Sequence, residues 1–309
     1  GVLTEPCSKL LSAHPEWRAA QTFFREIIPL SDTKKIRRGF VDVPHGQMHY
    51  RTVGEGTPLL FLHASPGSSK QLEKLISDFA DVGQVFAPDT PGNGDPLSLE
   101  TVEITDLAKA MLDFMDAMGI EKADVYGSHT GGTIATELAI LAPERVRSLV
   151  ADGVMVLTPA EFDDLMSTYA FPFPADLEGA YLIKIFQFCR DQYMFFPWYK
   201  RTREFRRDNG LGSAEDIKAW VLEVLKANET YHNNYRAAFR WQAFDRFPLV
   251  NVPAMVISAE NDPLLETSRS SAKALKGGNF VQLPRFDDST FSTARKTAMT
   301  VLMNSVETQ

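Results

Sequence analysis

The chain has 309 residues, 44% of them hydrophobic and 23% charged, a composition typical of a folded globular protein that excludes wholesale disorder. Its formal net charge of −8 disfavours nucleic acid as a partner, and no stretch approaches the roughly 18 apolar residues that span a membrane. Two cysteines are too few for a disulfide framework or a thiolate metal site, so we expect a cytoplasmic protein.

The chain begins with a segment of helical character and then changes pattern. Residues 1–35 carry apolar side chains at helical spacing, and we expect a helical extension packed on the main body. From residue 36 onward, short apolar strands and amphipathic helices alternate. We expect strands at 39–43, 48–53, 58–63, 84–87, 123–127, 146–152, 253–258 and 280–283, and helices at 70–80, 101–118, 130–142, 266–275 and 291–304.

This alternation predicts an α/β fold with a doubly wound, mostly parallel sheet. It stops over residues 155–248, so we expect a helical cap inserted into a core made of residues 36–154 and 249–309. The cap is rich in aromatic side chains, which either form its own small core or line an apolar pocket. We take Trp198 and Tyr199 as candidate substrate contacts.

A basic cluster also lies in the predicted cap. Its members are Lys200, Arg201, Arg203, Arg206 and Arg207. Such a cluster can bind an acidic ligand, but we interpret it as the solvated face of a helix.

The turn at residues 127–131 carries the most specific local pattern. Gly127-Ser128-His129-Thr130-Gly131 follows a predicted strand and opens a predicted helix. This is the small-x-x-x-small pattern of a nucleophile elbow, where the turn is so tight that the two flanking positions must be small and the central side chain enters the cleft. A serine is expected at the centre, but this chain has His129.

Together with three further segments, the elbow resembles the α/β-hydrolase fold family, in the capped subgroup of epoxide hydrolases, haloalkane dehalogenases, carbon–carbon bond hydrolases and small esterases. Residues 62–67 (LHASPG) are similar to the family's oxyanion loop. Residues 87–94 (APDTPGNG) are similar to its strand-to-loop signature, and residues 259–263 (AENDP) to its acid-bearing turn. The resemblance spans about residues 36–305 and implies a hydrolytic enzyme.

The family's serine–histidine–acid triad is absent. The resemblance implies a histidine on the loop after the last strand, but no histidine follows His232. Aligning that loop places Asp288 there, or Asp287 if the loop differs by one residue. We therefore predict that Asp288 holds the His129 ring through one nitrogen and leaves the other free to take a proton. Asp262, the family's acid by resemblance, is expected nearby as a second carboxylate.

Two effects act in opposite directions on the pKa of His129. The positive end of the helix that follows the elbow lowers it, whereas a neighbouring carboxylate raises it. Either outcome leaves a group that titrates near neutrality, as a general base or acid needs.

Other residues near these motifs have simpler interpretations. His63 follows a buried strand, and we expect it to brace the oxyanion loop through hydrogen bonds. Ser128 is a weaker candidate nucleophile, because Tyr126 and Thr130 would then occupy positions that must be small. No local pair of ligands supports a metal site, and we expect neither a metal nor a cofactor.

The sequence therefore predicts a cofactor-independent hydrolase of a small, largely apolar carbonyl or ester substrate, with His129 as base or nucleophile. The resemblance implies that the Thr130 N–H and one from Ala64 or Ser65 stabilise the oxyanion. One alternative is a lyase or decarboxylase-type enzyme, in which His129 moves a substrate proton and no water is consumed. Another is a ligand-binding receptor that has lost catalysis. We expect a small-molecule partner, no nucleic acid and no membrane, and the oligomeric state stays open.

Overall fold

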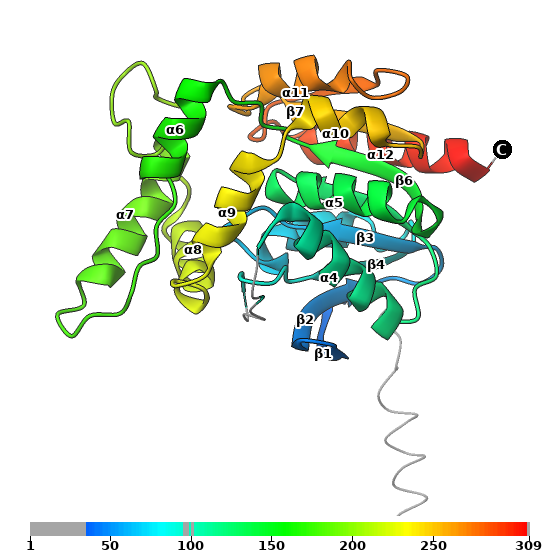
Figure 1. Ribbon diagram of the computed structural model, residues 1–309, viewed down its shortest axis with the longest axis horizontal. Coiled ribbons are helices and arrows are strands. Elements are labelled where there is room, and N and C mark those ends of the chain that lie inside the picture. The colour runs from blue at the N-terminus through cyan, green and yellow to red at the C-terminus, as the bar shows by residue number, and fades with distance from the viewer. Residues whose placement is uncertain (1–34, 95–98, 100–101, 308–309) are drawn as a thin grey trace, which may run out of the picture.

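The computed structural model describes residues 35–94, 99 and 102–307 (Figure 1). The extension predicted over residues 1–35 therefore lies outside the described residues, apart from Lys35. None of the helices in the described part of the chain is long and apolar enough to cross a membrane.

The described strands form one eight-stranded sheet with the order β1-β2-β4-β3-β5-β6-β7-β8. β1 and β2 pair antiparallel, as do β2 and β4, and all other neighbours are parallel. This confirms the predicted α/β class and the mostly parallel sheet. The strands are β1 Arg37–Val43, β2 Gly46–Val53, β3 Pro58–Leu62, β4 Gln84–Pro88, β5 Ala123–Ser128, β6 Val146–Asp152, β7 Ala254–Ala259 and β8 Phe280–Leu283.

Helices cover both faces of this sheet, because the central strands are apolar on both sides. In β5, Val125 faces a core shared with α4 and α5, whereas the next residue, Tyr126, faces a core shared with α3 and α12. This alternation with period two is the reason that one strand contributes to two cores. The flanking helices are α3 Glu73–Asp78, α4 Ile104–Ala117, α5 Thr130–Leu141, α11 Leu265–Ala272 and α12 Phe291–Glu307.

The chain between β6 and β7 is mostly helical, and its residues 155–248 are called the cap below. Its helices α6 to α9 gather at one side of the sheet (Figure 1). Many of its aromatic side chains, Tyr231 and Phe188 among them, pack against one another in a core of their own. These helices are α6 Pro159–Thr168, α7 Ala180–Met194, α8 Ala214–Lys226 and α9 Tyr231–Arg240, and α10 Ala243–Arg246 leads back to the sheet.

Candidate active site

The turn between β5 and α5 holds His129 in a strained backbone conformation. Its φ of 48° and ψ of −111° make it the one non-glycine residue with positive φ in the described part of the chain. A Cβ atom on Gly127 would lie 2.0 Å from the Gly131 carbonyl oxygen, and one on Gly131 would lie 2.3 Å from the Leu62 carbonyl oxygen. The two small positions of the elbow are therefore required by backbone contact. Strain of this kind persists where surrounding structure imposes it, and it is common at functional sites.

His129 forms a hydrogen bond with Asp262, the residue that follows β7. The distance from His129 Nε2 to Asp262 Oδ2 is 2.9 Å, and the other carboxylate oxygen accepts the Leu264 N–H at 2.7 Å. The Asp262 side chain is only 1% exposed, whereas that of His129 is 35% exposed. Because the carboxylate accepts from Nε2, the neutral ring carries its hydrogen there. The remaining nitrogen, Nδ1, has no hydrogen-bond partner among the described residues, so its lone pair is available to take a proton.

The electrostatic environment makes His129 more basic than a free histidine. Burial lowers the pKa of the ring, but the charge and the hydrogen bond of Asp262 outweigh it, with a further contribution from Asp152. The net pKa of His129 is raised. The pKa of Asp262 is lowered in turn, because His129 and the Leu264 N–H offset the cost of burying its charge. Of the two opposing effects on the pKa of His129 considered from the sequence, the neighbouring carboxylate therefore has the larger influence.

The prediction that Asp288 holds this ring is wrong. Asp288 is exposed, and its Oδ1 accepts both the N–H and the hydroxyl of Thr290 at 2.7 Å. A short local turn just before α12 therefore satisfies this carboxylate. The alternative, Asp287, pairs with Arg285 at 3.0 Å. Asp262, predicted only as a second carboxylate, is the partner that contacts His129.

The sequence offered the N–H of Ala64 or that of Ser65, in the loop after β3, as an oxyanion donor. The Ala64 N–H donates to Gln71 Oε1 at 3.0 Å, so the prediction of Ala64 as an oxyanion donor is wrong. The N–H groups of Ser65 and Thr130 have no hydrogen-bond partner within the described part of the chain, and both residues line the same cavity as His129. These two N–H groups can therefore stabilise an oxyanion.

His63 has the bracing role that the sequence predicted. Its Nδ1 lies 2.9 Å from the Ala64 carbonyl oxygen, and its Nε2 accepts the Thr90 N–H at 2.9 Å. Burial lowers the pKa of His63. Both nitrogens are occupied within the protein, so this histidine is not a free base.

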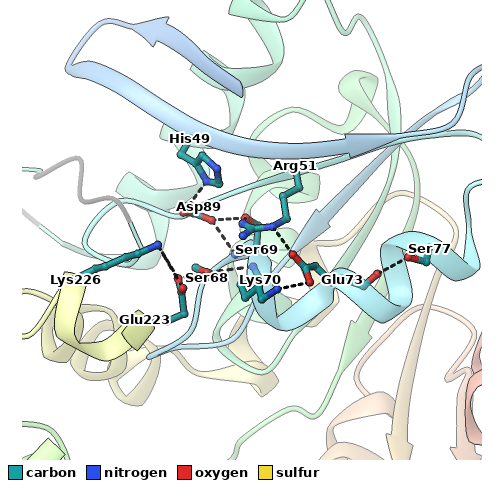
Figure 2. Close-up of polar contacts among 10 residues, drawn as sticks. All are labelled: His49, Arg51, Ser68, Ser69, Lys70, Glu73, Ser77, Asp89, Glu223 and Lys226. Carbon is teal, nitrogen blue, oxygen red and sulfur yellow. Dashed lines mark hydrogen bonds and ion pairs between the residues drawn. The ribbon is translucent and has the colours of Figure 1, made fainter. Parts of the chain in front are cut away.

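A buried polar network fixes the far end of the oxyanion loop (Figure 2). Asp89 Oδ1 accepts the Ser69 N–H at 2.8 Å and the Ser69 hydroxyl at 2.5 Å, and Asp89 Oδ2 lies 3.0 Å from His49 Nδ1. Arg51 donates to Ser69 Oγ at 2.6 Å. Burial opposes ionisation of Asp89, but His49, the charge of His63 and the Ser69 donors lower its pKa to about 2. The loop is thereby held rigid, as a preorganised donor requires.

The same network reaches the cap. Ser68 donates to Glu223 of α8 at 2.5 Å, and Lys226 pairs with Glu223 at 3.3 Å (Figure 2). One polar chain therefore connects the cap to the loop that carries the Ser65 N–H.

Trp198 and Tyr199 do not line the cavity, so the prediction that they contact substrate is wrong. The Trp198 indole donates to the Tyr169 carbonyl at 2.9 Å, and the Tyr199 hydroxyl donates to Asp164 at 2.9 Å. Both side chains have their polar ends satisfied within the cap. The aromatic walls of the cavity, which has a volume of about 370 Å³, come instead from Tyr169, Phe195, Phe196, Trp220, Tyr235 and Phe239.

Sequence reasoning missed several polar side chains of the cavity wall, among them Gln192, Arg207 and Arg295. The basic cluster was interpreted as a solvated helix face, but residues 200–207 are not helical, and Arg207 turns into the cavity. It donates to the Gln192 carbonyl at 2.8 Å, and burial lowers its pKa. An irregular segment has no periodicity from which this orientation can be predicted. Within the described ranges, no group of three or more His, Cys, Asp or Glu side chains is arranged to hold a metal ion.

Comparison with known proteins identifies relatives of this chain. The profile of the alpha/beta hydrolase fold family matches residues 57–289. The 2-hydroxy-6-oxo-6-phenylhexa-2,4-dienoate hydrolase of Comamonas testosteroni is 26% identical over 223 residues, which are 70% of this chain and 66% of that protein. Bifunctional epoxide hydrolase 2 of Mus musculus is 24% identical, over 76% of this chain and 49% of that protein. The chain thus spans between half and two thirds of these two relatives.

Solved structures share the fold at low sequence identity. A hydrolase from Pseudomonas aeruginosa PA01 superposes with a TM-score of 0.65 at 16% identity, covering 86% of this chain and 98% of that chain. Epoxide hydrolase VrEH1 from Vigna radiata superposes with a TM-score of 0.64 at 18% identity, covering 90% of this chain and all of that chain. On the profile match, supported by these superpositions, the chain belongs to the alpha/beta hydrolase fold family.

Proposed function

We propose that this protein is a cofactor-independent hydrolase of small ester-type substrates in which His129 acts as a general base. The observation that carries the proposal is the 2.9 Å hydrogen bond from His129 Nε2 to the buried carboxylate of Asp262. It orients the ring and leaves Nδ1 as the acceptor, in a cavity that also exposes two unpaired backbone donors. The relatives named as hydrolases support a hydrolytic reaction.

The reaction follows from these groups. Nδ1 of His129 removes a proton from a water molecule as the water oxygen bonds to the carbonyl carbon of the substrate. Negative charge develops on the carbonyl oxygen, where the N–H groups of Ser65 and Thr130 stabilise it. The imidazolium, stabilised by Asp262, then returns the proton to the leaving oxygen as the carbon–oxygen bond breaks. The products are a carboxylic acid and an alcohol.

A panel of small p-nitrophenyl and alkyl esters tests this proposal. We expect wild-type turnover and a loss of about 10²–10⁴-fold in kcat/KM for His129→Ala, the usual contribution of a positioned base. His45→Ala is the matched control, because His45 is exposed in the turn between β1 and β2 and should leave turnover unchanged. A fluorophosphonate probe should leave Ser128 unlabelled.

Three results would overturn the proposal. Labelling of Ser128 together with loss of activity would make serine the nucleophile. Undiminished turnover in His129→Ala would remove the histidine from the mechanism. Ligand binding without turnover in the wild type would identify a receptor instead of an enzyme.

A further inference from the structure

Arg295, on the second turn of α12, brings a positive charge to the cavity wall that carries His129. Its guanidinium lies over the Phe291 ring, with Cζ 4.8 Å from the ring centroid. Its Nε is buried and has no hydrogen-bond partner, and no carboxylate among the described residues lies within ion-pair distance of it. The two terminal nitrogens of the guanidinium are not buried in this way and have no hydrogen-bond partner among the described residues, so they can donate to a ligand in the cavity.

The buried carboxylate on which the Arg295 charge acts has a hydrogen-bond donor of its own. Asp152, at the end of β6, accepts the Tyr126 hydroxyl at 2.7 Å through Oδ2. Arg295 acts on Asp152 only through space, without a hydrogen bond or an ion pair. Arg295 therefore keeps its hydrogen-bonding capacity for the cavity.

Gln192 also lines this cavity, on the side of the cap. Gln192 of α7 is 6% exposed, and its Oε1 accepts the Tyr235 hydroxyl at 3.1 Å, but its Nε2 has no partner. Arg207, in contrast, donates to the Gln192 carbonyl and lies in the field of Asp262. Arg207 is thus held by a main-chain carbonyl, whereas the terminal nitrogens of Arg295 have no hydrogen-bond partner in the described part of the chain.

We propose that the cavity binds an organic carboxylate, with Arg295 as the residue that holds its anionic group. The chemistry is that of a small carboxylate with an aromatic or branched apolar body, which also carries the carbonyl that reacts. Guanidinium and carboxylate match as a charge-assisted, two-pronged pair. The aromatic walls and the volume of about 370 Å³ suit a body of one ring. The statement that the ligand carries a reacting carbonyl rests on the proposed hydrolase function, but the statement that the cavity recognises a carboxylate does not.

Binding of phenylacetate and its neutral isostere phenylacetamide tests the proposal, measured by calorimetry and by the fluorescence of Trp220 in the cavity wall. We expect wild-type protein to bind the carboxylate at least about tenfold more tightly than the amide, since charge-assisted hydrogen bonds are about twice as strong as neutral ones. Arg295→Gln should remove this preference, and Arg295→Lys should restore part of it. This wild-type comparison requires no variant, so it stands even if an Arg295 variant fails to fold.

Lys296→Gln is the matched control. It removes the same charge from the next residue of α12, but Lys296 pairs with Asp81 at 2.6 Å and does not line the cavity. The carboxylate preference should survive in Lys296→Gln. Equal binding of acid and amide, or a preference that persists in Arg295→Gln, would overturn the proposal. A preference that depends on Arg295 in a protein without ester turnover would uphold this inference and reject the hydrolase function.

Discussion

The molecule contains two histidine–aspartate pairs with nearly equal distances from ring nitrogen to carboxylate oxygen, but in very different surroundings. His49 and Asp89 lie 3.0 Å apart, and His129 and Asp262 lie 2.9 Å apart. In the first pair both side chains are buried, Asp89 serves two further donors from Ser69, and His49 packs edge-on against Phe40. In the second pair the ring is one third exposed to a cavity. The pair alone does not define a site, and what differs is the exposure of the ring, which is 7% in the first pair and 35% in the second.

Backbone geometry explains why only one pair is exposed in this way. His49 lies in the regular strand β2, where its side chain joins a buried polar network. His129 lies at a positive φ imposed by the contacts of Gly127 and Gly131. The fold therefore applies strain at the second pair and ordinary strand geometry at the first.

Alanine substitution of each histidine should distinguish the two pairs most strongly. His129→Ala should lose about 10²–10⁴-fold in kcat/KM, because it removes the base, and about 1–3 kcal/mol of stability, because buried Asp262 loses a partner. His49→Ala should keep most of its activity but lose about 1–3 kcal/mol of stability, because buried Asp89 loses a partner. Ester turnover and chemical denaturation of both variants measure this. Equal effects on activity would abolish the distinction.

Asp262→Asn should lower kcat by about 10²–10⁴-fold, because an amide orients the ring in the wrong tautomer. The neutral ring is the active form and its pKa is raised, so wild-type activity should fall as the pH drops through a midpoint above about 6.5. Without the Asp262 charge, burial dominates and this midpoint should move to lower pH. Asp288→Asn is the control, since the Asp288 side chain accepts hydrogen bonds only from Thr290 among the described residues, and a shift in its profile would revive the rejected pairing.

Gly153→Ala tests whether the position of the His129 ring matters. An added Cβ would lie 2.7 Å from Cδ2 and Nε2 of His129, the nitrogen bonded to Asp262. Displacing the ring by a fraction of an ångström should reduce kcat by about 10–100-fold. Gly119→Ala is the control, because Gly119 has a similar φ of 66° but open space around its Cβ position. Both variants should lose about 1 kcal/mol from backbone strain, and equal kcat values would contradict this account.

Asp89→Asn should lower stability in a way that depends on pH. The pKa of Asp89 in the folded protein is lowered to about 2 from 3.8, so its contribution is fully present above about pH 4 and is lost as the pH falls toward 2. At pH 7 the variant should be about 2 kcal/mol less stable than the wild type, and the gap should close near pH 2. Urea denaturation at both pH values measures this. A gap independent of pH would mean that Asp89 acts through shape and not through charge.

Much of the fold could be predicted from the sequence, because apolar periodicity places strands and helices directly. The segment around Val125 and Tyr126 is apolar on both faces, and both faces are covered. The elbow could also be predicted, since Gly127 and Gly131 meet a steric requirement that is local to the turn.

The polar partners of the site could not be predicted in the same way. Whether Asp262 or Asp288 meets His129 depends on the path of two loops, and a local turn with Thr290 already satisfies Asp288. Arg207 lies in an irregular segment without periodicity. Arg295 lies on a helix, but only the packing of that helix shows which of its side chains reaches the cavity.

Nitrogen-15 NMR of the histidine rings tests the central claim most directly, with His129 assigned by comparison with His129→Gln. We predict that neutral His129 carries its hydrogen on Nε2, that Nδ1 is unprotonated, and that the ring titrates with a pKa above about 6.5 that falls in Asp262→Asn. A neutral ring protonated on Nδ1, or a titration unchanged in Asp262→Asn, would contradict the account.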